Sequence, residues 1–517
     1  TDGPRLSDDE ALSGGVSPLR FGKLRGLTPP AQNSEPDPEW TIMTSAEILA
    51  ALLSDVEREA VARRCAPEAT YRLQFHAGFT FRDAAHLAPY LHDLGITHVY
   101  ASPYLKARPG SKHGYDVLDH QHLNPEIGGD SDFAAFIDAL RQHELGQILD
   151  VVPNHMGIVG NENLWWNDVL ENGPSSPYAN YFDIAWQASS RPTLRDRVLL
   201  PLLGEPYGRA LELQQIRLQY EAGAFTLHYF DHRLPVAPDT WSKILTHNLE
   251  QLETTLGKDA PHLQEYQSIL TAVRNLPART EQSAERIAER QREKEVIKRR
   301  LAALTEGCAE VRDHIAAVVA LYNGKADDPH SFDLLDQLLD EQPYRLSSWR
   351  VASDEINYRR FFDVNELAAL RMERPEVFAA THVLIFQLLR ERKLSGLRID
   401  HPDGLFDPRQ YLQRLQRHYL LELARQAHQS NHEYQRIDWS ELEGPLLERI
   451  DAGALPDRSL YVVVEKILGT GEALPADWPV YGTTGYDFLT LLGDLFVDPA
   501  GVKPFTTLYC NWIDDYM

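Results

Sequence analysis

The spacing of apolar residues changes twice along the chain. Residues 1–40 are rich in Gly, Pro, Ser and Asp and show no hydrophobic period, which predicts a mobile leader. From Ser45 to about Arg64 the apolar residues follow helical spacing and predict an amphipathic helix. After Ala69, short apolar runs alternate with amphipathic stretches. This alternation is typical of a parallel sheet built from βα units.

Five apolar runs are predicted to be strands, and polar or ionisable residues stand at the end of each. They are Thr70–Gln74, His98–Ala101, Gln147–Val152, Gly396–Asp400 and Leu460–Glu465. A βα barrel builds its active site from the C-terminal ends of its strands, so these residues are candidates for chemistry. The pattern predicts an α/β fold of the TIM-type (β/α)8 barrel class, with about six strands supplied by this chain and the barrel incomplete at the C-terminus.

About 240 residues separate the third and fourth predicted strands, far more than one crossover connection needs. We therefore expect a large, mainly helical lobe over residues 160–350, inserted after strand 3 between barrel segments 41–159 and 351–517. The second barrel segment is expected to lack the last strands and a C-terminal β domain. Within the lobe, Glu281 to Leu321 predicts one long helix whose mixed charges form a solvated face.

Composition narrows the class of protein. The 517 residues include 76 Asp and Glu against 51 Lys and Arg, and the resulting net charge of -25 disfavours nucleic acid and anionic membranes as partners. No apolar run approaches the ~20 residues that cross a bilayer, and the N-terminus lacks signal-peptide order, so we expect a cytoplasmic enzyme. The three cysteines are widely spaced and predict neither a disulfide framework nor a zinc site.

Three of the predicted strand ends carry the candidate chemistry. Asp150 begins the run that reaches Asn154 and His155, Arg398 precedes Asp400 by two residues, and Glu465 closes an apolar strand. Retaining glycoside chemistry needs one carboxylate that attacks and one carboxyl that protonates the leaving oxygen. Asp400 and Glu465, at the ends of successive strands, meet that need. We expect Arg398 to lower the pKa of Asp400, and partial burial to keep Glu465 protonated.

The order of these motifs is more specific than any one of them. Asp-x-x-x-Asn-His, then Gly-x-Arg-x-Asp, then a Glu closing an apolar strand resembles the pattern of the α-amylase superfamily. Five further stretches resemble the maltooligosyl trehalose synthases within it, namely Thr70–Phe75, Trp165–Tyr178, Tyr358–Glu366, His401–Pro408 and Gly482–Phe488. Of these, Trp165 and Trp166 are expected to be core residues.

The resemblance implies that Asp400 is the nucleophile and Glu465 the acid/base. It implies substrate contacts from Tyr115, His155, Arg398, His401 and Asp403, and structural support of the site from Asp150 and Asn154. The implied reaction converts the reducing-end α-1,4 bond of a maltooligosaccharide into an α,α-1,1 bond. It needs no metal or organic cofactor and pairs functionally with a trehalose-releasing hydrolase.

One departure from the superfamily bears on activity. The third essential Asp is expected long after the acid/base Glu, yet only 52 residues follow Glu465, and none of their aspartates stands in the expected context. We therefore expect this chain alone to be inactive or nearly so. The alternatives are an α-glucan hydrolase or transferase of the same superfamily, and a non-catalytic glucan-binding remnant.

Overall fold

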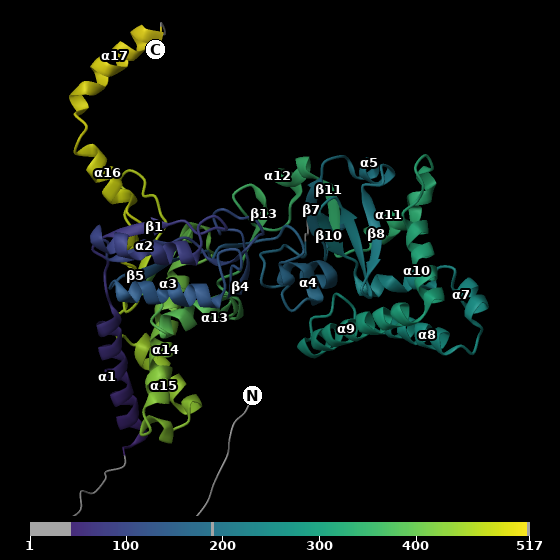
Figure 1. The fold of residues 1–517 in the computed structure, drawn as a ribbon, viewed down its shortest axis with the longest axis horizontal. Helices are drawn as coiled ribbons and strands as arrows, with labels where there is room; N and C mark the ends of the chain where they lie inside the picture. The colour runs from purple at the N-terminus through teal and green to yellow at the C-terminus, as the bar shows by residue number, and fades with distance from the viewer. Residues whose placement is uncertain (1–42, 188–190, 514–517) are drawn as a thin grey trace, which may run out of the picture. The chain divides into compact units, whose positions relative to one another are not determined.

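A parallel sheet of six strands carries the predicted chemistry, as seen in a computed structural model that describes residues 43–187 and 191–513 (Figure 1). The strands, in sheet order, are β1 (Thr70–Leu73), β2 (His98–Ala101), β5 (Gly146–Val151), β14 (Gly396–Ile399), β15 (Tyr461–Val464) and β16 (Gly482–Thr483). The five expected strands are confirmed to within one residue at each end, and β16 is the sixth. The sheet is a partial TIM barrel with β1 and β16 at its edges.

The main helices outside the inserted lobe accompany the strands, and the last two of them extend away from the sheet with almost no buried side chain (Figure 1). They are α1 (Ser45–Arg63), α2 (Phe81–Asp93), α3 (Asp130–Gln142), α13 (Pro375–Arg390), α14 (Pro408–Ser430), α15 (Trp439–Asp451), α16 (Tyr486–Asp494) and α17 (Val502–Ile513). The helix expected from Ser45 is confirmed as α1, which packs against α14. The leader predicted for residues 1–40 lies outside the described residues.

An aromatic cluster holds α2 and α3 side by side against the sheet (Figure 1). Phe81, the first residue of α2, is fully buried, and its ring lies 5.1 Å from Phe133 and 5.3 Å from Phe75, measured between centroids. Thr80 begins the helix with a capping box to Asp83. Each buried Phe contributes about 1.5–3 kcal/mol by leaving water. This packing fixes the first two strands relative to β5.

Short strands extend from the sheet toward the site. They are β3 (Leu105–Ala107) with β4 (Val117–Leu123), and a three-stranded antiparallel sheet of β12 (Arg360–Phe361), β13 (Val364–Ala369) and β6 (His155–Gly157). In the second sheet His155 pairs with Ala369. The hairpin of β12 and β13 is thereby placed beside the residues that follow β5.

The inserted lobe is not helical throughout. Its helices are α4 (Leu164–Asn172), α5 (Tyr207–Glu212), α6 (Trp241–Thr246), α7 (Leu249–Leu256), α8 (Pro261–Arg274), α9 (Ala284–Gly307), α10 (Ala309–Tyr322), α11 (Asp333–Asp340) and α12 (Ala352–Glu355). It also contains an antiparallel sheet of β8 (Ile216–Glu221), β9 (Ala224–Tyr229) and β10 (His232–Pro235), and a parallel pair of β7 (Val198–Leu203) with β11 (Tyr344–Ser348).

The single long helix expected over Glu281 to Leu321 is wrong, because the chain breaks at Cys308. This residue is extended, with φ -135° and ψ 113°, and separates α9 from α10. The buried positions 301, 304, 308, 311 and 315 keep helical spacing straight through the break. Periodicity alone therefore gave no sign of it, although Gly307 favours a helix end. α9 lies alongside α8 (Figure 1).

The charges of α9 are also not all solvated, contrary to expectation. Arg290 is fully buried and Lys294 is 3% exposed. Lys294 Nζ lies 2.6 Å from a carboxylate oxygen of Asp168 and 2.6 Å from one of Glu171, both on α4. Buried cations require such partners, because an unpaired charge in the interior is costly. The inner face of α9 is thus an ionic clamp on α4.

Among the described residues, no helix combines the length and apolar character needed to cross a membrane.

Candidate active site

Asp150 is the centre of a hydrogen-bond network at the C-terminal ends of the strands. It is 2% exposed, and Arg398 Nη1 donates to its Oδ1 at 2.6 Å. The hydroxyls of Tyr115 and Tyr100 donate to its Oδ2 at 2.6 and 3.0 Å. Register explains the first contact, since Arg398 lies directly opposite Asp150 in the pairing of β14 with β5. This geometry supports the predicted structural role of Asp150.

Two members of this network, Arg72 and Tyr100, were missed from the sequence. Arg72 Nη1 lies 3.3 Å from Asp150 Oδ2, and its guanidinium lies 4.7 Å from the centroid of the Tyr100 ring. Burial, followed by the charge of Asp150, raises the pKa of Tyr100 and keeps its hydroxyl a donor. The two residues pair across β1 and β2. Aligning the predicted strands in parallel register would have placed them on one sheet face.

Asp400 lies one residue beyond β14 and is 7% exposed. Arg398 Nη1 donates to Asp400 Oδ1 at 2.5 Å, so one guanidinium nitrogen serves both Asp400 and Asp150. Burial raises the pKa of Asp400 to about 6; Arg398 opposes this shift and the charge of Asp150 adds to it. Arg398 lowers the pKa of Asp400 as expected, but the net pKa is raised because the loss of hydration outweighs the shared cation.

Glu465 follows β15 at the position next to Asp400. Ile399 pairs with Val464, and the Glu465 amide donates to the Ile399 carbonyl at 2.8 Å. Its half-buried carboxylate accepts from the His401 amide at 3.1 Å. The structure thus brings together the two predicted catalytic carboxylates at neighbouring strand ends. That Glu465 is protonated stays a prediction.

His401 turns the chain directly after Asp400. Its φ of +45° lies in the left-handed region, which a residue other than Gly adopts at some cost. The His401 ring packs against Phe361 of the β12–β13 hairpin, with centroids 5.0 Å apart. Asp403, two residues on, has a side chain 54% exposed and pairs with Lys466 Nζ at 3.0 Å. Both residues border the carboxylates, as expected of groups that contact a ligand.

His155 is buried beside the same hairpin. It is 1% exposed, its ring centroid lies 4.4 Å from that of Phe361, and its Nε2 has no hydrogen-bond partner in the described chain. Burial lowers the pKa of His155 to about 3, so the imidazole is neutral at pH 7. A buried ring nitrogen without a partner costs free energy unless a ligand satisfies it. This geometry fits the predicted sugar contact.

Asn154 links the strand end to the loop after Asp400. Its Oδ1 accepts from Arg359 Nη1 at 2.9 Å, and the same nitrogen donates to the Gly404 carbonyl at 2.6 Å. Arg359 also contacts Asp183 at 2.9 Å. The predicted supporting role of Asn154 agrees with these contacts, while Arg359 was not singled out from the sequence.

A cavity of about 330 Å³ opens beside the network. Its walls are Arg72, Tyr100, Tyr115, Arg398, Thr484, Gly485, Tyr486 and Leu489. The last four residues belong to the loop after β16 and to α16. Three tyrosine rings and two guanidinium groups give the cavity both flat apolar faces and hydrogen-bond donors, which is the chemistry of a site for a polyhydroxylated ligand.

The aspartates that follow Glu465 have other roles in the described residues. Asp477 pairs with Arg409 at 3.1 Å, and Asp487 accepts a hydrogen bond from Thr483. Asp498 caps a short helix through the Ala500 amide, at 2.9 Å. Asp494 is exposed on α16. Asp514 and Asp515 lie outside the described residues. Each of the four described aspartates that follow Glu465 is therefore exposed or engaged in one of these other contacts.

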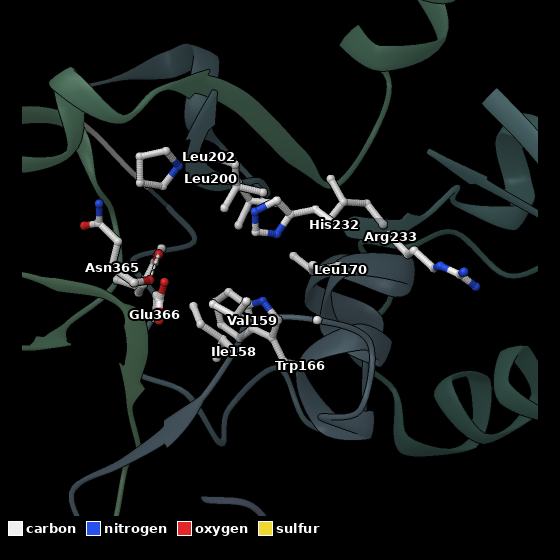
Figure 2. A pocket seen from close by; sticks show the side chains of 14 residues that line it. Ile158, Val159, Trp166, Leu170, Leu200, Leu202, His232, Arg233, Asn365 and Glu366 are labelled. Atoms are coloured by element: carbon white, nitrogen blue, oxygen red, sulfur yellow. Dashed lines mark hydrogen bonds between the residues drawn. The ribbon is translucent and has the colours of Figure 1, made fainter. Parts of the chain in front are cut away.

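Trp166 is a core residue, as expected. It is 1% exposed and packs edge-on against Phe182 and Tyr358, with centroids 4.9 and 5.4 Å apart. It forms one wall of a separate cavity of about 190 Å³ with both polar and apolar walls, where Figure 2 shows it with Ile158, Leu170 and His232. Trp165 is instead half-buried and stacks on Tyr178, with centroids 5.6 Å apart.

No cluster of three or more His, Cys, Asp or Glu side chains in the described parts of the chain is arranged to hold a metal ion. The cysteines are unpaired thiols, with Cys65 exposed and Cys308 and Cys510 buried.

Comparison with known proteins places this geometry in a family. Residues 85–236 match the model of the alpha amylase catalytic domain. A putative maltooligosyl trehalose synthase of Mycobacterium tuberculosis is 31% identical over 445 residues, which are 85% of this chain and 40% of the relative. The chain therefore spans well under half the length of this relative.

Solved structures give the same result. The structure of maltooligosyltrehalose synthase from Arthrobacter ramosus is 31% identical, with a TM-score of 0.56 over 87% of this chain and 41% of that one. The crystal structure of a hypothetical maltooligosyl trehalose synthase from Sulfolobus tokodaii is 28% identical, with a TM-score of 0.52 over 86% of this chain and 42% of that one.

Proposed function

We propose a function from the premise that the chain belongs to the α-amylase superfamily and is homologous to its maltooligosyl trehalose synthases. Its site converts the reducing-end α-1,4 bond of a maltooligosaccharide into an α,α-1,1 bond. The observation that carries the proposal is the pair of carboxylates, Asp400 and Glu465, at adjacent strand ends above the Asp150–Arg398 network. Retaining glycosyl transfer uses two such carboxylates.

In the first step the ionised Asp400 attacks the anomeric carbon of the glucosyl unit next to the reducing end. Glu465 gives its proton to the departing glycosidic oxygen, which releases the terminal glucose and leaves a glucosyl ester on Asp400. In the second step the anomeric hydroxyl of that glucose attacks the same carbon. Glu465 takes the hydroxyl proton, Asp400 departs as a carboxylate, and no water is consumed.

The remaining predicted residues would hold the sugar. Tyr115 presents a ring to one face of it, while Arg398, His155, His401 and Asp403 meet its hydroxyls.

Isomerisation rather than hydrolysis requires that the released glucose stays and water does not enter. The β12–β13 hairpin supports such closure, since Phe361 packs on both His155 and His401. Exclusion of water raises the effective concentration of the acceptor hydroxyl. We propose that this hairpin and the inserted lobe together act as the lid.

The test is incubation of the purified chain with maltopentaose while reducing ends, free glucose and glycosyl-trehalose are followed together. An isomerase is expected to remove reducing ends without releasing free glucose. This activity should be absent in Asp400→Asn and retained in the surface control Asp498→Asn. Release of glucose with a gain of reducing ends would contradict the isomerase proposal and support the hydrolase alternative.

A second candidate is glucan binding without turnover by this polypeptide. It is favoured by the described sheet, in which β1 and β16 are edge strands that each pair on one side only. Under this candidate the chain binds maltopentaose but leaves its reducing ends unchanged. Under the first candidate, the product would suit a hydrolase that releases trehalose as the functional partner.

A further inference from the structure

A second large cavity lies in the segment that joins α4 to β7 and in the turn before α9. It measures about 960 Å³, and none of the residues proposed for the active site lines it. Small-molecule sites are commonly about 300–1,000 Å³ in volume. The cavity therefore has room for a short oligosaccharide.

Trp186 supplies a flat apolar surface to this cavity. It is half-buried, its indole Nε1 donates to the Ala179 carbonyl at 3.1 Å, and its own carbonyl accepts from the Asp196 amide at 2.9 Å. The first bond fixes the orientation of the ring, and the second fixes the backbone that carries it. A fixed indole face is the usual partner of the apolar face of a pyranose ring.

The polar groups around Trp186 are neutral amides and hydroxyls with one carboxylate. Asn180, Asp196, Thr280 and Gln282 line the cavity, and their side chains make no hydrogen bond to any described residue. Such groups are available to hydroxyls, which both donate and accept. Asp196 is the one ionisable side chain in the lining, so anionic ligands such as sugar phosphates are disfavoured.

The cavity lies near the active site along the chain but is distinct from it. Phe182 bridges to Leu370, whose amide donates to the Asn154 carbonyl at 2.8 Å. Trp186 follows Phe182 by four residues, and four residues of extended chain span at most about 14 Å. Trp186 therefore lies within about 14 Å of Phe182, which bridges to the strand segment beside Asn154.

We infer that the Trp186 cavity is a glucan-binding site, separate from the active site, that takes part of a neutral α-1,4-glucan chain. The inference rests on the proposed function for its ligand class, since a site of this kind raises the local concentration of the glucan that the barrel acts on. Short oligosaccharides reach one of the two sites, whereas long chains engage both.

The test is titration of the full chain with maltopentaose by calorimetry, with cellopentaose as the β-linked comparison. We use Tyr115→Ala to weaken the active site, and Trp186→Ala, Trp186→Phe and Asn180→Ala to perturb the cavity. Trp349→Ala is the matched control, because Trp349 is an exposed tryptophan that does not line the cavity. Loss of the stacked ring is expected to weaken maltopentaose binding about tenfold in the Tyr115→Ala background, with Trp186→Phe retaining most of the affinity.

Three results would overturn the inference in distinguishable ways. Binding that is lost in Tyr115→Ala and unchanged in both Trp186→Ala and Asn180→Ala would remove the second site and leave the proposed function standing. Absence of any maltopentaose binding by the parent chain would remove both. Equal affinity for cellopentaose would reject an α-1,4-glucan as the ligand.

Discussion

Two buried carboxylates in this chain, Asp400 and Glu171, are each 7% exposed, yet their pKa values move in opposite directions. Burial raises the pKa of Asp400 to about 6 despite Arg398. Burial also acts to raise the pKa of Glu171, but Lys294 and Lys298 outweigh it and the net pKa is lowered. Degree of burial therefore does not distinguish the two regions.

What distinguishes them is how many cations each carboxylate has. Glu171 lies 2.6 Å from Lys294 Nζ and 2.7 Å from Lys298 Nζ, whereas Asp400 shares one nitrogen of Arg398 with Asp150. The cluster on α4 and α9 is charge-balanced and fixes two helices. The strand-end cluster is short of positive charge, which is the condition that leaves an acid near its titration point and available for chemistry.

Lys294→Ala is expected to lower the free energy of unfolding more than any other variant considered for this comparison. It leaves Asp168 and Glu171 buried with less positive charge, and breaking a buried pair typically costs about 3–5 kcal/mol of unfolding free energy. Urea denaturation measures the loss. Arg292→Ala, on the exposed side of the same helix, is the control and should change stability by less than about 0.5 kcal/mol. Equal effects of the two variants would remove the distinction between clamp and solvated face.

Glu171→Gln is expected to destabilise the chain by about 3 kcal/mol near neutral pH, because it leaves two lysines short of a buried partner. The folded pKa of Glu171 is lowered, so its contribution is present above the unfolded pKa and is lost as pH falls through the folded value. The deficit of the variant should therefore stay constant from pH 8 down to the unfolded pKa near 4.5 and shrink below it. A deficit that grows toward low pH would contradict the lowered pKa.

Asp400→Asn should show the opposite dependence on pH. The folded pKa of about 6 is above the unfolded one, so this group favours folding most below about pH 4 and loses that contribution as pH rises through 6. The stability of the variant relative to the parent should rise from pH 4 to pH 8 by up to about 3 kcal/mol, the equivalent of two pKa units. Parallel urea titrations of the two chains check the sign.

The smallest loss of stability is expected at Asp403, whose side chain lies at the exposed edge of the site. Asp403→Asn removes the pair with Lys466, but Lys466 keeps Glu472 at 2.8 Å and the Asp403 side chain is 54% exposed. The free energy of unfolding should fall by less than about 0.5 kcal/mol, because solvent screens exposed ion pairs. A weakening of maltopentaose binding in the same variant, without that stability change, would assign Asp403 to the ligand.

The sequence was sufficient where local pattern and topology agree. Five strands were predicted to within a residue at each end, because each is a short apolar run bounded by polar residues, and the parallel βα order brought Asp400 and Glu465 to neighbouring strand ends. β16 is only two residues long and has no such pattern. Arg72 and Tyr100 were missed because their role depends on register across strands, although that register follows from the predicted order.

Other features depended on tertiary contacts that no local pattern encodes. The buried face of α9 was predicted to be solvated, since Arg290, Lys294 and Lys298 are ordinary surface residues until α4 presents its acids to them. The net pKa shift of Asp400 likewise depends on how much hydration its carboxylate loses on folding. The position of Arg398 two residues earlier in the sequence does not predict that loss. The division into leader, lobe and barrel segments stays a prediction.

The pairing of β5 with β14 has a kinetic consequence. These strands are direct neighbours in the sheet, yet residues 152–395 lie between them along the chain. Closing so long a loop while it is disordered carries an entropic cost that slows folding, and contacts distant in sequence form late. We expect the intervening lobe to collapse first and to draw its two ends together, so that refolding shows a fast phase reported by lobe tryptophans and a slower one reported by the strand-end tyrosines.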